Sequence, residues 1–284
     1  MKKLLAGCLL LTLCAASCGQ REKGAKGPFA ALTEMVDSMK APTDTLPATS
    51  SESLPKPLEA DELFDDFIFN YASDEALQRQ RTVFPLPYDQ GGHRTEIGRK
   101  AWTHDPLFTE NNIYTLLFDR EQDMDIVGDT ALNAVQVEWL FLKSREMKRY
   151  FFRRTHGMWM LDSIALHPVK QGEGGDFLDF YTRFVSDSLY QRSHIHTPLR
   201  FITLDPDDEF SILETTLDLE QWYAFRPQMP ADWLSNICYG QRNEARSRTK
   251  ILKVNGIGNG YSNVFYFRKR LGEWELYKYE DTSI

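Results

Sequence analysis

The strongest constraint on the fold of this chain is an internal duplication. A block that begins at Phe64 and ends at Leu86 matches a block from Phe177 to Leu199 at a constant offset and without a gap. A repeated block of this kind indicates that the same structural unit occurs twice. The pairs of identical residues are Phe64/Phe177, Asp66/Asp179, Phe67/Phe180, Ser73/Ser186, Asp74/Asp187, Gln78/Gln191, Arg79/Arg192, Pro85/Pro198 and Leu86/Leu199.

A second repeated block lies near the end of each half. Residues Tyr150–Leu161 are similar to Phe265–Leu276, and the two blocks follow each other in the same order in both halves. The chain has 284 residues, and roughly 150 residues per domain is typical. We therefore predict two homologous domains, residues 59–169 and residues 170–284.

Each half is predicted to open with a helix that has one apolar face. Phe64, Phe67, Ile68 and Tyr71 stand at positions i, i+3, i+4 and i+7, which places them along one side of a helix. The corresponding residues of the second half are Phe177, Phe180, Tyr181 and Phe184. We expect this aromatic stripe to bury against a flat surface.

A second short helix is predicted to follow in each half. Ser73-Asp74 and Ser186-Asp187 are typical helix starts, because their side-chain oxygens accept hydrogen bonds from free backbone N–H groups. Pro85 and Pro198 are expected to end these helices, because proline cannot continue the helical hydrogen bonds.

Two charged pairs recur together with these helices. Asp66 and Arg79 of the first half correspond to Asp179 and Arg192 of the second. They could serve catalysis or hold an anion, but a site for one ligand need not occur in both halves. We therefore predict a structural salt bridge between the two opening helices of each half.

The later segments of each half are predicted to be strands. Apolar and polar residues alternate from Val135 to Trp139, as in a half-buried strand. Lys148–Arg154 and Trp159–Asp162 flank Thr155-His156-Gly157, which indicates a hairpin. Leu271-Gly272 marks the same turn in the second half. This order predicts an α+β fold class, in which N-terminal helices of each domain pack on a curved antiparallel sheet.

The recurring motifs resemble those of a family of uncharacterised bacterial lipoproteins. They are Phe-x-x-Phe, Ser-Asp, Gln-Arg and Pro-Leu in each opening block, and Gly-x-Trp at Gly157–Trp159 and Gly272–Trp274. The resemblance covers residues 59–284 and implies a cone similar to cystatin or nuclear transport factor 2 in each half. Thr197 departs from the pattern, since Phe84 stands there in the first half. The family has no established activity, so the resemblance implies a fold without a chemistry.

The N-terminus has the features of a targeting segment. Lys2 and Lys3 precede an apolar run from Leu4 to Leu13, which is typical of a secretory signal. Ala16-Ser17-Cys18 resembles the lipobox of bacterial lipoproteins, although Ala15 stands where that family prefers Leu. The resemblance implies a lipoprotein signal peptide over residues 1–17 and lipidation of Cys18. The alternative is a plain secretory signal that is cut nearby.

The next segment is predicted to be a tether. Residues 18–58 would carry the lipidated Cys18 and then a flexible linker that is rich in Pro, Ser and Thr towards its end. Acyl chains on Cys18 would make the membrane a partner. Gly19 follows the cysteine instead of Asp, which by the resemblance favours the outer membrane of the cell envelope and leaves the face open.

Composition excludes several classes of protein. The net charge of −8 argues against a nucleic-acid partner. Cys238 is the one cysteine left besides Cys18 after cleavage at the predicted site, which excludes an internal disulfide and a cysteine-based zinc site. Cys238 is expected to be a small buried hydrophobe, and the alternative is a nucleophile.

We identify no catalytic residue, cofactor site or metal site in the sequence, because the phosphate-binding, zinc-protease and nucleophile-elbow motifs are missing. The recurring Trp159 and Trp274 are expected in the cores. Trp102, Trp222 and Trp233 do not recur, so they are the candidate ligand-binding residues.

These observations favour a membrane-anchored envelope lipoprotein. Its function is expected to be non-enzymatic binding of a small ligand, a glycan or a partner protein. One alternative is a structural component of an envelope complex. The other is an enzyme with an acid or base in one cone cavity, which would need a buried Asp, Glu or His that faces a pocket.

Overall fold

The computed structural model describes residues 63–128, 131–241 and 247–284. The predicted signal peptide, Cys18 and the linker lie outside these residues. Within them, no helix has the length and apolar character needed to cross a membrane.

In both halves two helices precede a hairpin and four further strands, whereas η2 occurs in the first half alone and η3 and α6 in the second. The elements of the first half are α2 (Phe64–Ser73), α3 (Glu75–Gln80), β1 (Leu86–Gln90), β2 (His93–Ile97), β3 (Ile113–Phe118), the 3-10 helix η2 (Glu121–Gly128), β4 (Ala134–Phe141), β5 (Glu146–Thr155) and β6 (Met158–Pro168). Those of the second half are η3 (Gln171–Glu173), α4 (Gly175–Ser186), α5 (Ser188–Ser193), β7 (Ile195–Asp205), β8 (Asp208–Leu217), α6 (Leu219–Phe225), β9 (Trp233–Cys238), β10 (Thr249–Gly256), β11 (Ser262–Arg270) and β12 (Glu273–Asp281).

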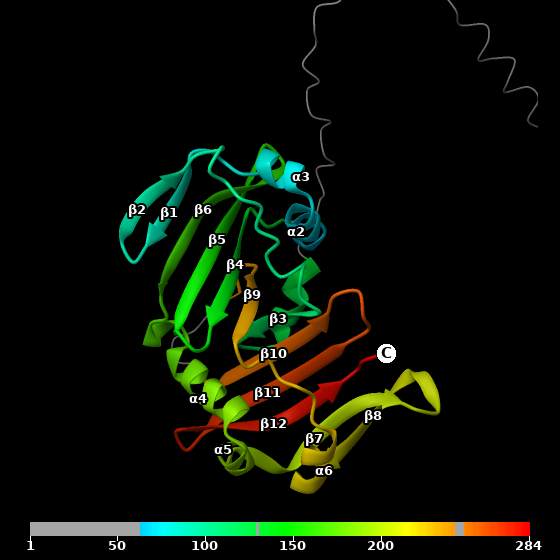
Figure 1. Ribbon diagram of the computed structural model, residues 1–284. Coiled ribbons are helices and arrows are strands. Elements are labelled where there is room, and N and C mark those ends of the chain that lie inside the picture. Colours follow the sequence, from blue (N-terminus) through cyan, green and yellow to red (C-terminus); the bar gives the residue numbers. More distant parts are fainter. Residues whose placement is uncertain (1–62, 129–130, 242–246) are drawn as a thin grey trace, which may run out of the picture. The chain divides into compact units, whose positions relative to one another are not determined.

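The strands form two six-stranded sheets (Figure 1). Their orders are β2-β1-β6-β5-β4-β9 and β3-β10-β11-β12-β7-β8. The expected α+β class with helices on sheets is confirmed, but the sheets are mixed and not purely antiparallel. β1 runs parallel to β6, and β7 runs parallel to β12. In each half, the first strand of the first hairpin pairs with the last strand of that half and runs in the same direction as it, which creates the parallel pair.

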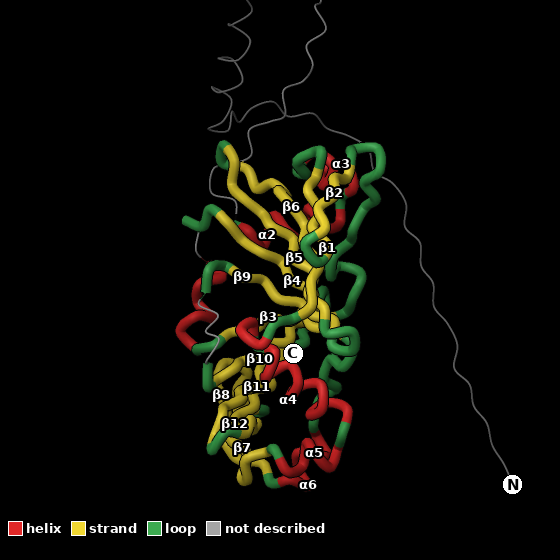
Figure 2. The backbone as a smooth tube through the Cα atoms, turned by 90° about the vertical axis from the view of Figure 1, so that its left-hand side faces the viewer, coloured by secondary structure: helices red, strands yellow, loops and turns green. Residues whose placement is uncertain are grey.

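Two strands are exchanged between the halves. β3 belongs to the first half but pairs with β10, and β9 belongs to the second half but pairs with β4. Each takes the place that the other would occupy if both halves were separate. The exchanged strands are edge strands of the two sheets and lie side by side where the sheets meet (Figure 2). The division at residues 169 and 170 therefore follows the order of the elements, whereas each sheet includes one strand from the other half.

Thr115 on β3 and Ser235 on β9 join the exchanged strands. The Thr115 backbone N–H donates to the Ser235 hydroxyl at 2.8 Å, and that hydroxyl donates to the Thr115 carbonyl at 3.2 Å. The Thr115 hydroxyl donates to the Ser235 carbonyl. Thr115 is paired with Val254 of β10, and Ser235 is paired with Trp139 of β4. Thr115 and Ser235 therefore hold matching places in the two sheets.

Each half has its own aromatic core, built in the same way. In the first, the ring centroids of Phe64 and Trp159 are 5.0 Å apart, and those of Phe64 and Phe152 are 5.4 Å apart. In the second, the matching distances from Phe177 are 5.2 Å to Trp274 and 5.3 Å to Phe267. The predicted helical stripes and the predicted core positions of Trp159 and Trp274 are confirmed.

The predicted helix starts and hairpins are also present. Asp74 caps α3 by accepting from the Ala76 and Leu77 N–H groups, and Asp187 caps α5 in the same manner. The turns between β5 and β6 and between β11 and β12 place two successive residues at positive φ, with Gly157 and Gly272 second. A two-residue hairpin turn requires this conformation, which explains why glycine recurs there.

Candidate functional site

A buried glutamine links the opening helices to the rest of each half. The Gln78 amide donates to the Tyr71 carbonyl at 3.1 Å, and its oxygen accepts from the Trp102 indole N–H at 3.1 Å. The Gln191 amide likewise donates to the Phe184 carbonyl at 3.1 Å. Its oxygen accepts from the Trp222 indole N–H at 3.4 Å.

Trp102 and Trp222 are therefore counterparts, although they do not align in the sequence. Their exposed fractions are 6% and 0%. Both rings are enclosed by the fold, in different cores, and leave little surface for a ligand. Trp233 differs, because it is half-exposed at the start of β9. The structure does not bring the three candidate tryptophans together.

The predicted salt bridge between the opening helices is wrong. Arg79 pairs with Glu75 of its own helix at 3.1 Å and donates to the carbonyls of Arg99 and Trp102. In the second half, Asp179 pairs with Arg145. Arg79 thus holds the loop that carries Trp102, and the neighbouring Gln78 bridges the two helices.

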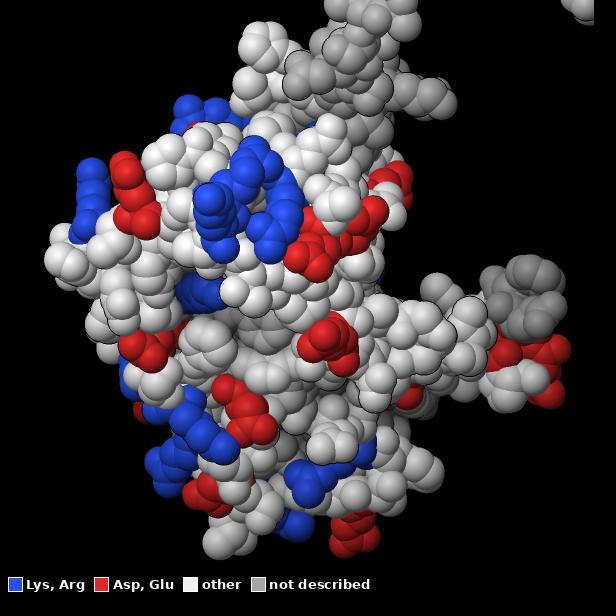
Figure 3. All heavy atoms as spheres, turned by 45° about the horizontal axis from the view of Figure 1, so that its top comes forward, with Lys and Arg blue, Asp and Glu red and all other residues white. Residues whose placement is uncertain are grey.

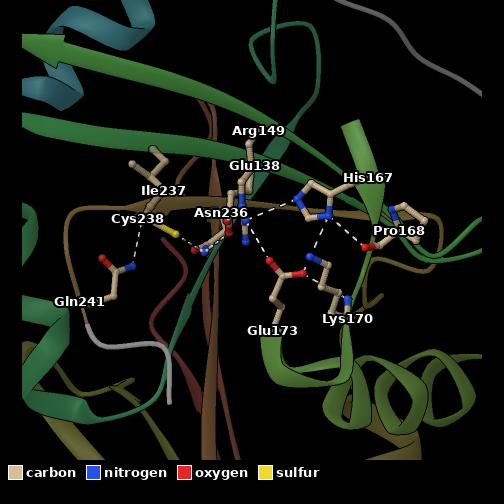
Figure 4. Close-up of polar contacts among 10 residues, drawn as sticks. All are labelled: Glu138, Arg149, His167, Pro168, Lys170, Glu173, Asn236, Ile237, Cys238 and Gln241. Atoms are coloured by element: carbon tan, nitrogen blue, oxygen red, sulfur yellow. Dashed lines mark hydrogen bonds and ion pairs between the residues drawn. The ribbon is translucent and has the colours of Figure 1, made fainter. Parts of the chain in front are cut away.

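A polar network occupies the junction between the halves (Figure 4). Glu138 on β4 accepts from Arg149 on β5 at 2.7 Å and from Asn236 on the exchanged strand β9 at 3.0 Å. Arg149 also donates to Glu173 in η3 at 3.0 Å. The network therefore joins three strands of the first sheet, the exchanged strand β9 among them, to the segment that connects the halves. The alternation in Val135–Trp139 predicted Glu138 on a polar face, but this face is covered.

Several neighbouring groups complete this junction network. His167 lies 3.4 Å from Arg149, and its other ring nitrogen lies 2.9 Å from the Pro168 carbonyl. Burial alone would raise the pKa of Glu173, but the Lys170 N–H and Arg149 lower it overall. A carboxylate held in this way is stabilised in its charged form.

Cys238 lies at the edge of the junction network and is half-buried. Its sulfur accepts from the Asn236 amide at 3.2 Å. Burial and the nearby Glu138 carboxylate raise the pKa of the Cys238 thiol well above its ordinary value. A thiol held in its neutral form is a poor nucleophile, which favours the structural interpretation of this cysteine.

The cavity beside this network is very small. It measures about 30 Å³ and is lined by side chains that include Asp119, Lys250 and Cys238. Asp119 and Lys250 form a buried ion pair. A cavity of this size holds water and excludes an organic ligand. Among the described residues, no group of three or more His, Cys, Asp or Glu side chains is placed to hold a metal ion.

Two acidic side chains of the first half lie near its aromatic core, where an acid or base would be expected. Asp105 accepts from the Tyr150 hydroxyl and from Lys148 at 3.2 Å. Asp65 accepts from the Tyr239 hydroxyl, and burial raises the pKa of Asp65. Both carboxylates are thus bonded to neighbours within the fold.

A larger groove opens at the starts of the two exchanged strands. It has a volume of about 520 Å³, within the usual range for small-molecule sites. Its walls come from the segment before β3, the loop between α6 and β9, and the start of β11. Its lining residues are Asn111, Asn112, Ile113, Pro227, Gln228, Met229, Pro230, Ala231, Asp232, Trp233 and Tyr261. We call it the Trp233 groove.

The polar groups of the Trp233 groove differ from those of the junction network. Among the described residues, no hydrogen-bond partner is present for the side chains of Asn112, Gln228, Trp233 and Tyr261. Asp232 is paired with Lys143 at 2.6 Å. Trp233 was a candidate ligand-binding residue from the sequence. No sequence pattern identified the other lining residues, because they come from three separated segments of the chain.

Two other recesses are lined by ion pairs. One, of about 370 Å³, lies beside α4 and includes the Arg145–Asp179 pair. The other, of about 510 Å³, lies beside β1 and β6 and includes the Arg94–Asp89 pair. Over the face in Figure 3, positive and negative side chains lie interspersed. An anionic polymer that needs a broad field of positive charge would not find one on this face.

Comparisons with known proteins identify a similar solved structure and a family for this chain. A crystal structure at 2.15 Å of an NTF2-like protein from Bacteroides fragilis NCTC 9343 is similar, with 60% sequence identity and a TM-score of 0.76. The match covers 81% of this chain and 100% of that one. No curated protein matches this chain. A family model described as a domain of unknown function, DUF4348, matches residues 43–281, so this chain belongs to the DUF4348 family and has an NTF2-like fold.

Proposed function

We propose that this protein is a non-enzymatic binding module, anchored by lipid to the outer membrane of the cell envelope, whose ligand occupies the Trp233 groove. The observation that carries the proposal is the set of polar side chains in that groove without partners in the described chain. These side chains are exposed or half-exposed, so the fold leaves their polar groups to water, and a ligand in the groove can bind them in its place.

The interior of the fold supports binding over catalysis. Aromatic side chains fill both cores, and the carboxylates of Asp65 and Asp105 are bonded to tyrosine hydroxyls. The enzyme alternative needs an acid or base that faces a substrate cavity. The tandem arrangement of NTF2-like repeats with two exchanged strands serves in this proposal as a rigid scaffold for the groove.

The anchor rests on the sequence of the first 58 residues. The apolar run and Cys18 fit a lipoprotein signal, and the Pro, Ser and Thr-rich linker gives the folded part reach from the membrane. Changing Cys18→Ala should move the protein from the membrane fraction to the soluble fraction. Cys238→Ala, at the other remaining cysteine, should stay with the membrane. Retention of Cys18→Ala in the membrane fraction contradicts the anchor.

Occupancy of the groove can be tested in cells. A photo-crosslinking amino acid at Gln228, an exposed lining residue, should give adducts detectable by mass spectrometry. The matched control is the same amino acid at Gln80, which is exposed on α3 and lies outside the groove. Equal labelling at both positions, or none at Gln228, overturns the proposal that the groove binds a ligand.

Exposed apolar side chains favour a structural role as the second candidate. Leu189 on α5, Phe225 on α6 and Ile212 on β8 are 79%, 70% and 66% exposed. A contact site would require these side chains to form one contiguous apolar patch, because apolar residues exposed singly are normal on soluble proteins. Combined substitution of the three by Ser should release a partner complex from solubilised membranes if this second function is correct, and should leave its size unchanged if it is not.

A further inference from the structure

We infer that the ligand of the Trp233 groove is a neutral saccharide chain. This inference rests on the proposed binding function and adds the chemical class of the ligand. It follows from three properties of the groove, which are the cluster of aromatic rings at its edge, the kind of its unpartnered polar groups, and its charge.

The aromatic surface continues from the groove onto the first sheet. Trp233 and Phe141 face each other across β9 and β4. The ring centroids of Trp139 and Trp233 are 4.7 Å apart, with their planes inclined at 60°. Those of Trp139 and Phe141 are 6.3 Å apart, with nearly parallel planes. All three rings are half-buried. Pyranose rings present C–H faces that stack on such rings, because aromatic faces carry partial negative charge.

The unpartnered polar groups both donate and accept hydrogen bonds. The amides of Asn112 and Gln228 do both, the Tyr261 hydroxyl does both, and the Trp233 indole N–H donates. Hydroxyl groups of a sugar match this mixture. A purely apolar ligand would remove these groups from water without giving them partners, which costs about 1–3 kcal/mol for each.

The charge of the groove disfavours ionic ligands. Neither Lys nor Arg is among its lining residues, and its one acidic residue, Asp232, is paired with Lys143. An anionic ligand would find no cation in the lining, and a cationic ligand would have to compete with Lys143 for Asp232. The neutral balance favours an uncharged ligand.

A peptide that adds a strand is also disfavoured. β3 ends its sheet and begins at the groove, but its outer edge is already engaged. The N–H groups of Thr115 and Leu117 donate to the side chains of Ser235 and Asn236, both at 2.8 Å. Strand addition depends on free backbone groups of this kind.

The test uses the full chain in detergent on an array of neutral oligosaccharides. Anionic oligosaccharides and unstructured peptides provide the comparison. At least one neutral oligosaccharide should bind, and Trp233→Ala should weaken that binding at least tenfold. Gln228→Ala should weaken that binding two- to fivefold. Because it changes only an exposed side chain, it also tests the groove in the event that Trp233→Ala does not fold. Leu271→Ala, at an exposed apolar residue in the β11–β12 turn outside the groove, should bind as the parent protein does.

The outcomes separate this inference from the proposed function. Binding of neutral oligosaccharides that does not depend on Trp233 and Gln228 overturns the inference. Binding restricted to anionic oligosaccharides or peptides, or no binding on the array together with crosslinked adducts at Gln228 in cells, also overturns it but leaves the groove as a ligand site. No binding on the array and no adduct at Gln228 overturns both.

Discussion

The junction network and the Trp233 groove both contain polar side chains but use them differently. At the junction, Glu138 and Arg149 are bonded to each other and to partners from two other parts of the chain. In the groove, Gln228 and Tyr261 have no partner in the described chain. The difference suggests that the junction holds the two halves together, whereas the groove is open to a ligand. Substitutions in the two regions should therefore affect different properties.

The largest expected effect is the loss of Arg149. Arg149→Ala leaves the buried Glu138 and the half-buried Glu173 without their cation, and removal of one partner from a buried pair such as Glu138–Arg149 costs about 3–5 kcal/mol. Thermal and denaturant unfolding measure it. Arg153→Ala is the matched control, because Arg153 lies on the same strand in an exposed pair with Asp162. Exposed pairs contribute about 0–1 kcal/mol. Equal losses for the two variants would contradict the structural role of the junction network.

The recurring glutamines should come next. Gln78→Ala and Gln191→Ala each leave a tryptophan indole N–H and a helix carbonyl without partners inside a core. Unsatisfied buried groups cost about 1–3 kcal/mol each, so the two groups should together lower the free energy of unfolding by at least about 2 kcal/mol in each variant. Gln80→Ala, on the exposed side of α3, is the control. A large loss in one half only would show that the duplicated contacts are not equivalent.

The acid limb of the stability profile should depend on Glu173. Its folded-state pKa is lowered from 4.5. A carboxyl whose pKa falls on folding stabilises the protein above its unfolded-state pKa, and this stabilisation is lost as the pH falls through the folded-state value. The free energy of unfolding should thus decrease below about pH 4.5, and Glu173→Gln should reduce this slope. The free energy of unfolding can be measured by urea titration at several pH values. If its dependence on pH is the same in Glu173→Gln and in the parent protein, Glu173 does not contribute to the stability of the junction network.

The smallest expected effect on stability is in the groove. Gln228→Ala removes an exposed side chain without a partner, so the free energy of unfolding should stay within about 0.5 kcal/mol of the parent value. The same substitution is expected to weaken ligand binding. A loss of stability as large as that of Arg149→Ala would show that the groove is part of the scaffold.

The duplication predicted much of the local structure. The aromatic spacing in Phe64–Tyr71 predicted α2, and the Asp74 cap and the Gly157 turn lie where the local pattern placed them. These features depend on residues that are close in the sequence. The Asp66–Arg79 salt bridge was wrong because periodicity does not show which of several nearby carboxylates an arginine reaches.

The candidate site was less accessible to sequence reasoning. Trp233 was identified because it does not recur, but the same reasoning selected Trp102 and Trp222, which lie in the cores. Those two residues occupy matching places on unlike segments, a loop in one half and α6 in the other, so an ungapped alignment cannot pair them. The groove residues come from three segments that only the fold brings together.

The sequence by itself determined the order of helices and strands and their repetition, because caps, turns and apolar periodicity act over a few residues. Only the tertiary structure decided that β3 and β9 change places, that Glu138 is buried, and that Trp233 borders an open groove. Those features depend on which strands pair across more than a hundred residues. Both halves offer nearly the same edge to an incoming strand, so local pattern cannot choose between them.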